Sequence, residues 1–334
     1  MTADPRTGDP ITIQLAEPAH EAQILALGHR TLGWKDEQRT TDLYRWKHDE
    51  NPFGPSPRWV ALHDGRVVGF RVLLRWGFRR PDGSTAVAVR AVDTATDPDH
   101  QGKGIFRSLT TTAVDELRAQ GVHLIFNTPN GQSRPGYLKM GWSELGRPRV
   151  AVRPKLLSVA RVATSRVPAD LWSQETTAGH DAPAYFDDPR HDAVIADLIG
   201  DGPTGRWCTD RSVPWLRWRY GLPHLRYRVI SSDDLGGGSP GLVVFRVRRR
   251  GAALEATVCE VLTSSPRTRR RLLRAVLRSS GADYLLVASD RIADLTPTAS
   301  LPALAPVVTW RALDGSADPA IGDIAFSIGD LELF

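Results

Sequence analysis

One segment, residues 85–127, restricts the fold more than any other part of the chain. Thr85–Thr96 is a strand-like run rich in Val, Ala and Thr, and a Gly-rich turn follows it. Gly104–Gln120 then has apolar residues along one stripe at helical spacing, and Val122–Asn127 is almost wholly apolar, as in a buried parallel strand. A strand, a helix and a buried strand in this order predict a mixed α/β sheet.

The elements around this segment continue the pattern. Ile11–Leu15 alternates as a strand does, and Ala19–Leu32 carries apolar residues at helical spacing. Two further strands, Arg58–Leu62 and Val67–Trp76, are joined by a short turn, and Arg134–Lys139 is predicted to form a short helix. The first stretch of the chain therefore reads as one domain of strands and helices around a mixed sheet.

A faint repeat predicts a second domain. Leu43–Lys47 (Leu-Tyr-Arg-Trp-Lys) resembles Trp215–Arg219 (Trp-Leu-Arg-Trp-Arg), and a pair of predicted strands follows each of them. Gly281 precedes an apolar strand as Gly121 does. Two copies of one fold explain these parallels. The second copy is expected to hold the strands Tyr227–Ser231, Gly241–Arg248, Leu254–Leu262 and Ala282–Ala288 and the helix Pro266–Ser279.

The length of the chain supports this division, because 334 residues correspond to two domains at about 100–200 residues each. We expect a flexible tail at 1–10 and a first domain at 11–150. The irregular, proline-containing stretch at 151–190 is expected to connect the halves, and the second domain is expected at 191–334.

The composition is that of an ordinary globular protein, with 41% apolar and 24% charged residues. Cys208 and Cys259 are too few for a disulfide framework or a four-ligand zinc site, so we expect buried or half-buried thiols and no metal. The polar N-terminus lacks a signal sequence, and no apolar run approaches the ~20 residues of a membrane span, which predicts a cytoplasmic protein without membrane contact. The formal net charge of +5 suits an anionic small ligand as well as nucleic acid.

The turn within Thr94–Arg107 is the segment that carries chemistry. A strand-to-helix turn exposes unpaired backbone N–H groups at the start of the helix, where the helix dipole also favours anions. Gly104 lacks the Cβ that would block a close approach, and Lys103 and Arg107 add positive charge. The pattern predicts a diphosphate site, with an ordinary strand–helix turn as the alternative; it is neither a Walker motif nor a dinucleotide-binding glycine motif.

The same turn resembles the acetyl-CoA signature of the GNAT N-acetyltransferase superfamily, [Gln/Arg]-x-x-Gly-x-[Gly/Ala]. Gln101 and Gly104 match the signature, and Phe106 departs from it. The resemblance continues over roughly residues 11–150, and it implies that the strand contacts the pantetheine arm while the turn holds the diphosphate. The implied cofactor-binding residues are Thr94, Ala95, Thr96, Gln101, Gly102, Lys103, Gly104, Ile105, Phe106, Arg107, Asn127 and Ser133.

The resemblance also implies a mechanism, in which a neutral amine attacks acetyl-CoA directly in a ternary complex. Tyr137, in a Tyr-x-x-x-Gly-Trp ending, stands at the family's general-acid position and would protonate the leaving thiolate; the alternative is a core aromatic. Asp93, just before the cofactor-facing strand residues, is our candidate base, with Glu50 and His48 in a predicted loop, or solvent, as alternatives. Asn127 and Ser133 would bond the pantetheine amide or the acid, or else cap a loop.

The second copy differs at the equivalent turn, where Ser264–Arg271 contains no glycine. We therefore expect this half to have lost CoA binding and to be a degenerate GNAT-like domain. Its helix carries six arginines within Arg267–Arg278, which predict either a solvated basic face or an RNA surface, although no aromatic stacking pattern accompanies them. Tandem arrangements of this kind resemble the Eis-like acetyltransferases and the Fem-like transferases that use aminoacyl-tRNA.

The sequence thus predicts two tandem GNAT-like domains of α/β fold, the first an acetyl-CoA-dependent N-acetyltransferase. We expect the acceptor to be a primary amine on a small molecule, such as an amino sugar or an antibiotic-like metabolite, a choice that rests on fold analogy. The alternatives are a Fem-like transferase and a module that binds CoA without turnover. Nucleic acid is the less favoured partner, and the sequence leaves a homo-oligomer open.

Overall fold

The computed structural model describes residues 10–35, 37–164, 167–288, 299–300 and 305–332. The predicted tail at 1–10 falls outside these residues, apart from Pro10. The chain forms two compact units. Unit 1 holds the described residues up to Gly77 with Ala86–Glu144 and Thr309–Asp318, and unit 2 holds Phe78–Thr85 with the described residues of Leu145–Val308 and Pro319–Phe334.

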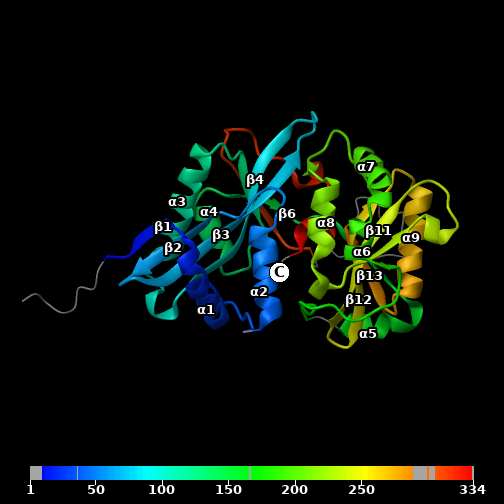
Figure 1. Ribbon diagram of the computed structural model, residues 1–334, viewed down its shortest axis with the longest axis horizontal. Coiled ribbons are helices and arrows are strands. Elements are labelled where there is room, and N and C mark those ends of the chain that lie inside the picture. The colour runs from blue at the N-terminus through cyan, green and yellow to red at the C-terminus, as the bar shows by residue number, and fades with distance from the viewer. Residues whose placement is uncertain (1–9, 36, 165–166, 289–298, 301–304, 333–334) are drawn as a thin grey trace, which may run out of the picture. The chain divides into compact units, whose positions relative to one another are not determined.

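Sheet A has eight strands in the order β1-β2-β3-β4-β5-β15-β6, with β9 pairing with the end of β3 (Figure 1). Strand β5 runs parallel to β4, whereas β1, β2 and β3 form antiparallel pairs. A sheet with both kinds of pairing confirms the expected mixed α/β class. The strands are β1 (Thr12–Leu15), β2 (Arg58–His63), β3 (Arg66–Arg79), β4 (Thr85–Thr96), β5 (Leu124–Asn127), β6 (Ser143–Gly146), β9 (Cys208–Thr209) and β15 (Val308–Ala312).

Helices cover both faces of this sheet in unit 1. Alternate residues of β2 point to opposite faces, so Trp59 joins one core cluster and Val60 the other. Helix α3 packs its apolar stripe, which includes Leu109, into the first cluster, and α1 packs Leu27 into the second. The helices are α1 (Glu21–Thr31), α2 (Gln38–Asp49), α3 (Ile105–Ala119) and α4 (Arg134–Lys139), with short 3-10 turns at Pro18–His20 and Pro98–His100.

Sheet B, in unit 2, has seven strands in the order β14-β7-β13-β12-β11-β10-β8. Helix α9 packs Leu272 and Val276 into the core cluster on one face of this sheet. The strands are β7 (Val150–Pro154), β8 (His180–Asp181), β10 (Arg228–Ser231), β11 (Leu242–Arg250), β12 (Ala253–Leu262), β13 (Tyr284–Ala288) and β14 (Ala299–Ser300). The helices are α5 (Val159–Thr164), α6 (Ala182–Asp187), α7 (Asp192–Gly200), α8 (Val213–Gly221), α9 (Pro266–Ser279) and α10 (Ile328–Leu331).

The two sheets share one succession of elements. In sheet A, helix α2 precedes three neighbouring strands, β2, β3 and β4, and helix α3 then leads to β5, parallel to β4. In sheet B, helix α8 precedes β10, β11 and β12, and helix α9 leads to β13, parallel to β12. The order of elements therefore repeats, and α2 and α8 contain the two short sequences that showed the repeat.

Each sheet also contains a strand from the far part of the chain. Strand β15 pairs antiparallel with β5 in sheet A, and β7 pairs antiparallel with β13 in sheet B. The expected domain boundaries do not include this exchange, because they place β15 in the second domain and most of β7 in the connecting segment. Those boundaries stay a prediction.

No helix within the described residues is both long enough and apolar enough to cross a membrane.

Candidate acetyl-CoA site and the buried network of unit 2

The parallel strands β4 and β5 separate at the centre of unit 1. Their pairing covers Ala88–Arg90 of β4, and β4 then continues to Thr96. Beyond Arg90, the edge of β4 that faced β5 no longer pairs with it. Such an edge offers backbone N–H and C=O groups to an extended ligand. Thr94, Ala95 and Thr96 lie on this stretch, and their contacts to a pantetheine arm stay a prediction. The Thr94 hydroxyl donates to the Phe70 carbonyl at 3.1 Å, so this side-chain donor already has a partner within the protein.

The turn between β4 and α3 has the geometry of an anion site. Gly102 and Gly104 adopt left-handed φ values of +76° and +78°, which only glycine adopts without strain. Gly104 is the N-cap of α3 and provides no side chain to bond the first N–H groups of the helix. A Cβ at either glycine would meet open space, and Gln101, Lys103 and Arg107 are exposed around it. The residues present therefore fit a diphosphate.

Tyr137 lies on α4, buried beside the start of α3. Its ring packs edge-on against Phe106 and Trp142, with centroids 5.5 Å and 5.2 Å away. Phe106 is the residue that departs from the signature, and it is accommodated because position 136 is glycine: a Cβ at Gly136 would lie 3.0 Å from the Phe106 ring. Ile105 is buried under the turn.

Arg71 of β3 was not predicted, and it donates from Nη2 to the Tyr137 hydroxyl oxygen at 2.9 Å. The sequence signal for it is one arginine within the otherwise apolar run Val67–Leu74. A charged residue in an apolar strand suggests a buried polar contact. The sequence around Arg71 does not show that this contact is with Tyr137.

Asn127 and Ser133 both bond within the protein. The Asn127 amide oxygen, at the end of β5, accepts from the Thr309 hydroxyl of β15. The Ser133 hydroxyl donates to the Asn130 side chain at 3.0 Å, and Ser133 begins α4. These bonds match the loop-capping alternative for Ser133, and a role of either side chain in cofactor binding stays a prediction.

Asp93 lies in a buried polar group formed with α2. Its Oδ2 is 2.6 Å from Lys47 Nζ and 2.8 Å from His48 Nε2, and His48 Nδ1 is 2.9 Å from the Ser56 hydroxyl. Burial alone would raise the pKa of Asp93, but the Lys47 charge and the His48 hydrogen bond outweigh it and lower the pKa to about 2. Burial lowers the pKa of His48 to about 4, despite its bond to Asp93. At neutral pH the carboxylate is ionised and the imidazole is neutral.

The chain Ser56–His48–Asp93 resembles a hydrolytic triad only in residue type. His48 is wholly buried and all its partners are buried, so no substrate reaches the serine in this arrangement. His48 was expected in a loop; this was wrong, because α2 extends to Asp49 and carries it. Glu50, at the C-terminal end of α2, is exposed.

The turn of unit 2 that corresponds to the glycine turn is closed by its own side chains. Ser265 caps α9 by accepting from the Thr268 N–H at 3.2 Å, and Pro266 has no N–H to offer. The arginines of α9 divide into two kinds. Arg271 donates to the carbonyls of Leu235 and Gly237 and so holds the neighbouring glycine-rich turn, and the half-buried Arg269 donates to the Ala288 carbonyl at 3.4 Å, whereas Arg267, Arg270, Arg274 and Arg278 are exposed.

A cavity of about 540 Å³ lies in unit 2 beside this turn, lined by the end of β12, the start of α9 and the segment around Phe326. Arg211 in its lining donates to Glu260, also in the lining, at 2.9 Å and to Asp330 at 2.8 Å. Cys208 and Cys259 also line it, both as buried free thiols, as expected, and burial raises the pKa of each.

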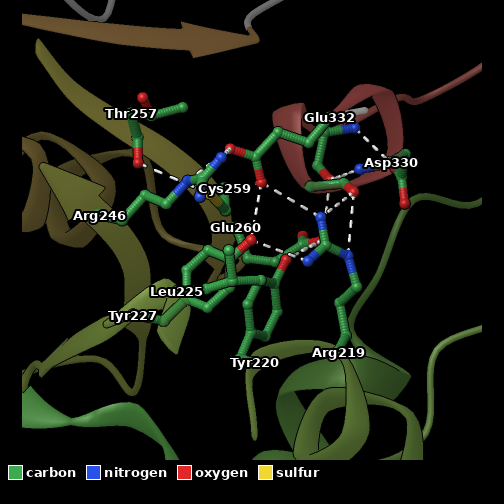
Figure 2. A network of polar contacts seen from close by, with 12 residues as sticks. Arg219, Tyr220, Leu225, Tyr227, Arg246, Thr257, Cys259, Glu260, Asp330 and Glu332 are labelled. Carbon is green, nitrogen blue, oxygen red and sulfur yellow. Dashed lines mark hydrogen bonds and ion pairs between the residues drawn. The ribbon is translucent and has the colours of Figure 1, made fainter. Parts of the chain in front are cut away.

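Behind the cavity, a network of charged side chains is buried in unit 2 (Figure 2). Figure 2 shows Glu332 between Arg246 of β11 and Arg219 of α8. The Glu332 carboxylate accepts from Arg246 at 2.7 Å, from Arg219 at 3.2 Å and from the Tyr227 hydroxyl at 2.8 Å. Burial alone would raise the pKa of Glu332, but Arg246, Arg248 and Arg219 outweigh it and lower the pKa to about 2. The network therefore holds an ionised carboxylate in the interior of unit 2.

Within the part of the chain that the structure describes, no cluster of three or more His, Cys, Asp or Glu side chains is arranged to hold a metal ion.

Comparison with known proteins shows which proteins this chain resembles. Residues 12–145 match the family model described as an acetyltransferase (GNAT) domain. A mycothiol acetyltransferase of Saccharopolyspora erythraea is 34% identical over 134 residues, which are 35% of this chain and 41% of the relative. That of Beutenbergia cavernae is 34% identical over 131 residues, 37% and 42% of the two chains. The matches thus span about two fifths of the length of these curated relatives.

Solved structures extend the likeness to nearly the whole chain as a likeness of fold. A GCN5-related N-acetyltransferase from Anabaena variabilis has a TM-score of 0.61 at 14% identity, covering 91% of this chain and 73% of its own. Eis1 from Mycobacterium abscessus has a TM-score of 0.55 at 15% identity, covering 91% and 74%. The glycine turn, the separated strands and the match over residues 12–145 lead to one conclusion: this part of the chain is an acetyltransferase domain of the GNAT superfamily.

Proposed function

We propose that the protein is an acetyl-CoA-dependent N-acetyltransferase that acts on a primary amine of a small molecule. The observation that carries the proposal is the turn from β4 to α3, where two left-handed glycines and an uncapped helix start face open space. The family match over residues 12–145 includes this turn.

Acetyl-CoA would enter as the acyl donor. Its diphosphate would take the N–H groups of the turn and the charges of Lys103 and Arg107, both exposed there. Its pantetheine arm has amide groups that suit the unpaired edge of β4 near Thr94–Thr96. The proposed contacts involve residues that the sequence analysis also assigns to cofactor binding.

The reaction needs one proton delivered and one removed. The amine nitrogen forms a bond to the thioester carbonyl carbon, the C–S bond breaks, and the thiolate takes a proton from Tyr137. Because the Tyr137 oxygen already accepts from Arg71, its own O–H is left to donate elsewhere. The product is an amide, and solvent returns a proton to Tyr137.

Asp93 is poorly suited to remove the amine proton, since a carboxyl group with a pKa of about 2 is a weak base at neutral pH. We assign Asp93 instead to fixing Lys47 and His48 on α2, and we assign removal of the proton to water. The prediction of Asp93 as base is retained as the alternative that mutation can test.

The acceptor class and the role of unit 2 complete the proposal. The curated relatives are named mycothiol acetyltransferases, which supports a small-molecule amine and adds desacetyl mycothiol to the amino sugars as a candidate. The repeated order of elements supports a tandem GNAT-like arrangement, with unit 2 degenerate because Ser265 and Pro266 occupy the place of the anion turn.

The test is a panel of amines assayed for thiol release from acetyl-CoA, with glucosamine, kanamycin, spermidine, lysine and desacetyl mycothiol. We expect release that depends on at least one amine and a product heavier by one acetyl group in mass spectra. Acetyl-CoA binding without release for any amine would support a CoA-sensing module instead. Absence of acetyl-CoA binding by calorimetry would overturn the proposal.

A further inference from the structure

Arg71 is a buried cation that meets no acidic side chain in the described part of the chain. Arg71 is 1% exposed, and among the described residues it forms no ion pair. Among those residues its side chain forms one hydrogen bond, from Nη2 to the Tyr137 oxygen, and Nε and Nη1 are buried without a partner. The guanidinium carbon lies 5.5 Å from the centroid of the Phe106 ring and 5.2 Å from that of Tyr137.

The surroundings of Arg71 differ from those of the buried arginines of unit 2. Unit 2 also buries arginines, but Arg211, Arg219 and Arg246 each meet a carboxylate within hydrogen-bond distance. A buried charge without such a partner is expensive, and two ring faces return only part of the cost. The positive charge of Arg71 is therefore available to whatever negative charge forms at its one polar contact, the Tyr137 oxygen.

We propose that Arg71 is a positioning residue for acyl transfer, acting through Tyr137. It fixes the phenol oxygen as an acceptor, so the phenol proton points to another partner, the leaving thiolate. When that proton moves to sulfur, negative charge passes to the Tyr137 oxygen, and the guanidinium 2.9 Å away stabilises it. This inference rests on the proposed function.

Phe106 has a part in the arrangement. It packs edge-on against Tyr137, and the Arg71 guanidinium carbon lies over its ring, so Phe106 in the first turn of α3 contacts both partners. The residue that departs from the acetyl-CoA signature thus keeps Arg71 and Tyr137 in contact. A glycine or alanine at this position would leave that side of the guanidinium without a ring.

The test compares Arg71→Met, which keeps the length and removes the charge, with Arg71→Lys, Tyr137→Phe and the double variant. We expect Tyr137→Phe to lower kcat about 100-fold and Arg71→Met about 10- to 100-fold, with KM for acetyl-CoA within about twofold of wild type. The double variant should be no slower than Tyr137→Phe, because Arg71 acts only through Tyr137. Arg71→Lys should recover part of the lost kcat.

Arg75→Met is the matched control, on the same strand and half-buried, with a long contact to Gln120 at 3.4 Å. It should keep the wild-type kcat. Urea unfolding of each variant separates loss of fold from loss of kcat, and the Tyr137 resonance of [13C]tyrosine-labelled protein, assigned with Tyr137→Phe, should move in Arg71→Met.

The outcomes separate the two proposals. Wild-type protein that releases no thiol with any amine refutes the proposed function and this inference with it. In an active wild type, an Arg71→Met variant with unchanged kcat, an unmoved Tyr137 resonance, or a double variant whose loss equals the product of the single losses would overturn the role of Arg71 alone.

Discussion

Glu332→Gln removes the negative charge at the centre of the buried network in unit 2 and keeps the shape of the side chain. The variant leaves Arg246 and Arg219, both buried, without the carboxylate that each now meets. Breaking a buried ion pair by removing one partner typically costs about 3–5 kcal/mol, because the remaining charge stays in the interior.

The pKa of Glu332 gives a second route to the size of the effect. The folded protein lowers it from 4.5 to about 2, and each unit of difference corresponds to about 1.4 kcal/mol, which gives about 3 kcal/mol in favour of the ionised, folded state. A folded pKa below the unfolded one means that this stabilisation is present above pH 4.5 and is lost as the pH falls toward 2.

We therefore expect Glu332→Gln to lower the free energy of unfolding by about 3 kcal/mol at pH 7, measured by urea denaturation followed by circular dichroism. The difference from wild type should shrink between pH 4.5 and pH 2. Glu175→Gln is the control, since Glu175 pairs with Arg226 on the surface and its loss should cost less than about 1 kcal/mol. If Glu332→Gln costs no more than this control, the buried network does not stabilise unit 2 and the reasoning fails.

Three further predictions concern unit 1. Gly104→Glu places a carboxylate and a strained left-handed residue at the turn, so calorimetry should show CoA affinity at least about tenfold weaker; normal binding would refute the diphosphate assignment. Tyr137→Phe should bind CoA as wild type does while thiol release slows about 100-fold, and an unchanged rate would exclude it as the acid. Asp93→Asn leaves Lys47 buried without its carboxylate and should cost about 3 kcal/mol in urea unfolding. Retained stability with lost activity would instead favour Asp93 as the base.

Many helices and strands were predictable because their apolar residues recur at the spacing of a helix or a strand. Strand β4 has the predicted bounds, and α9 has them as well, since its apolar stripe and its Ser-Pro start are both local signals. Helix α2 was missed because it is mostly polar. Its buried positions follow helical spacing, but they include Thr40, Lys47 and His48, so the sequence shows no apolar stripe there.

The parts that were not predictable depend on partners distant in the sequence. The glycine turn carries its own conformation, so its residues could be assigned, but the Arg71–Tyr137 contact joins a strand and a helix 66 residues apart. Likewise, the bond of Asn127 to Thr309 depends on which strand lies beside β5. The sequence of β5 does not show that β15 is its neighbour, because an apolar strand can pair with many other strands.

The strands β15 and β7 determine when the chain can fold during synthesis. Strand β5 is made early, but its neighbour β15 emerges from the ribosome roughly 180 residues later, about 10 to 40 s at ordinary rates of translation. Until then β5 remains an open edge, and β7 likewise waits for β13. A nascent chain of this protein therefore carries both open edges from the completion of β7 until β13 emerges, and β5 gains its neighbour only after β15 has been made.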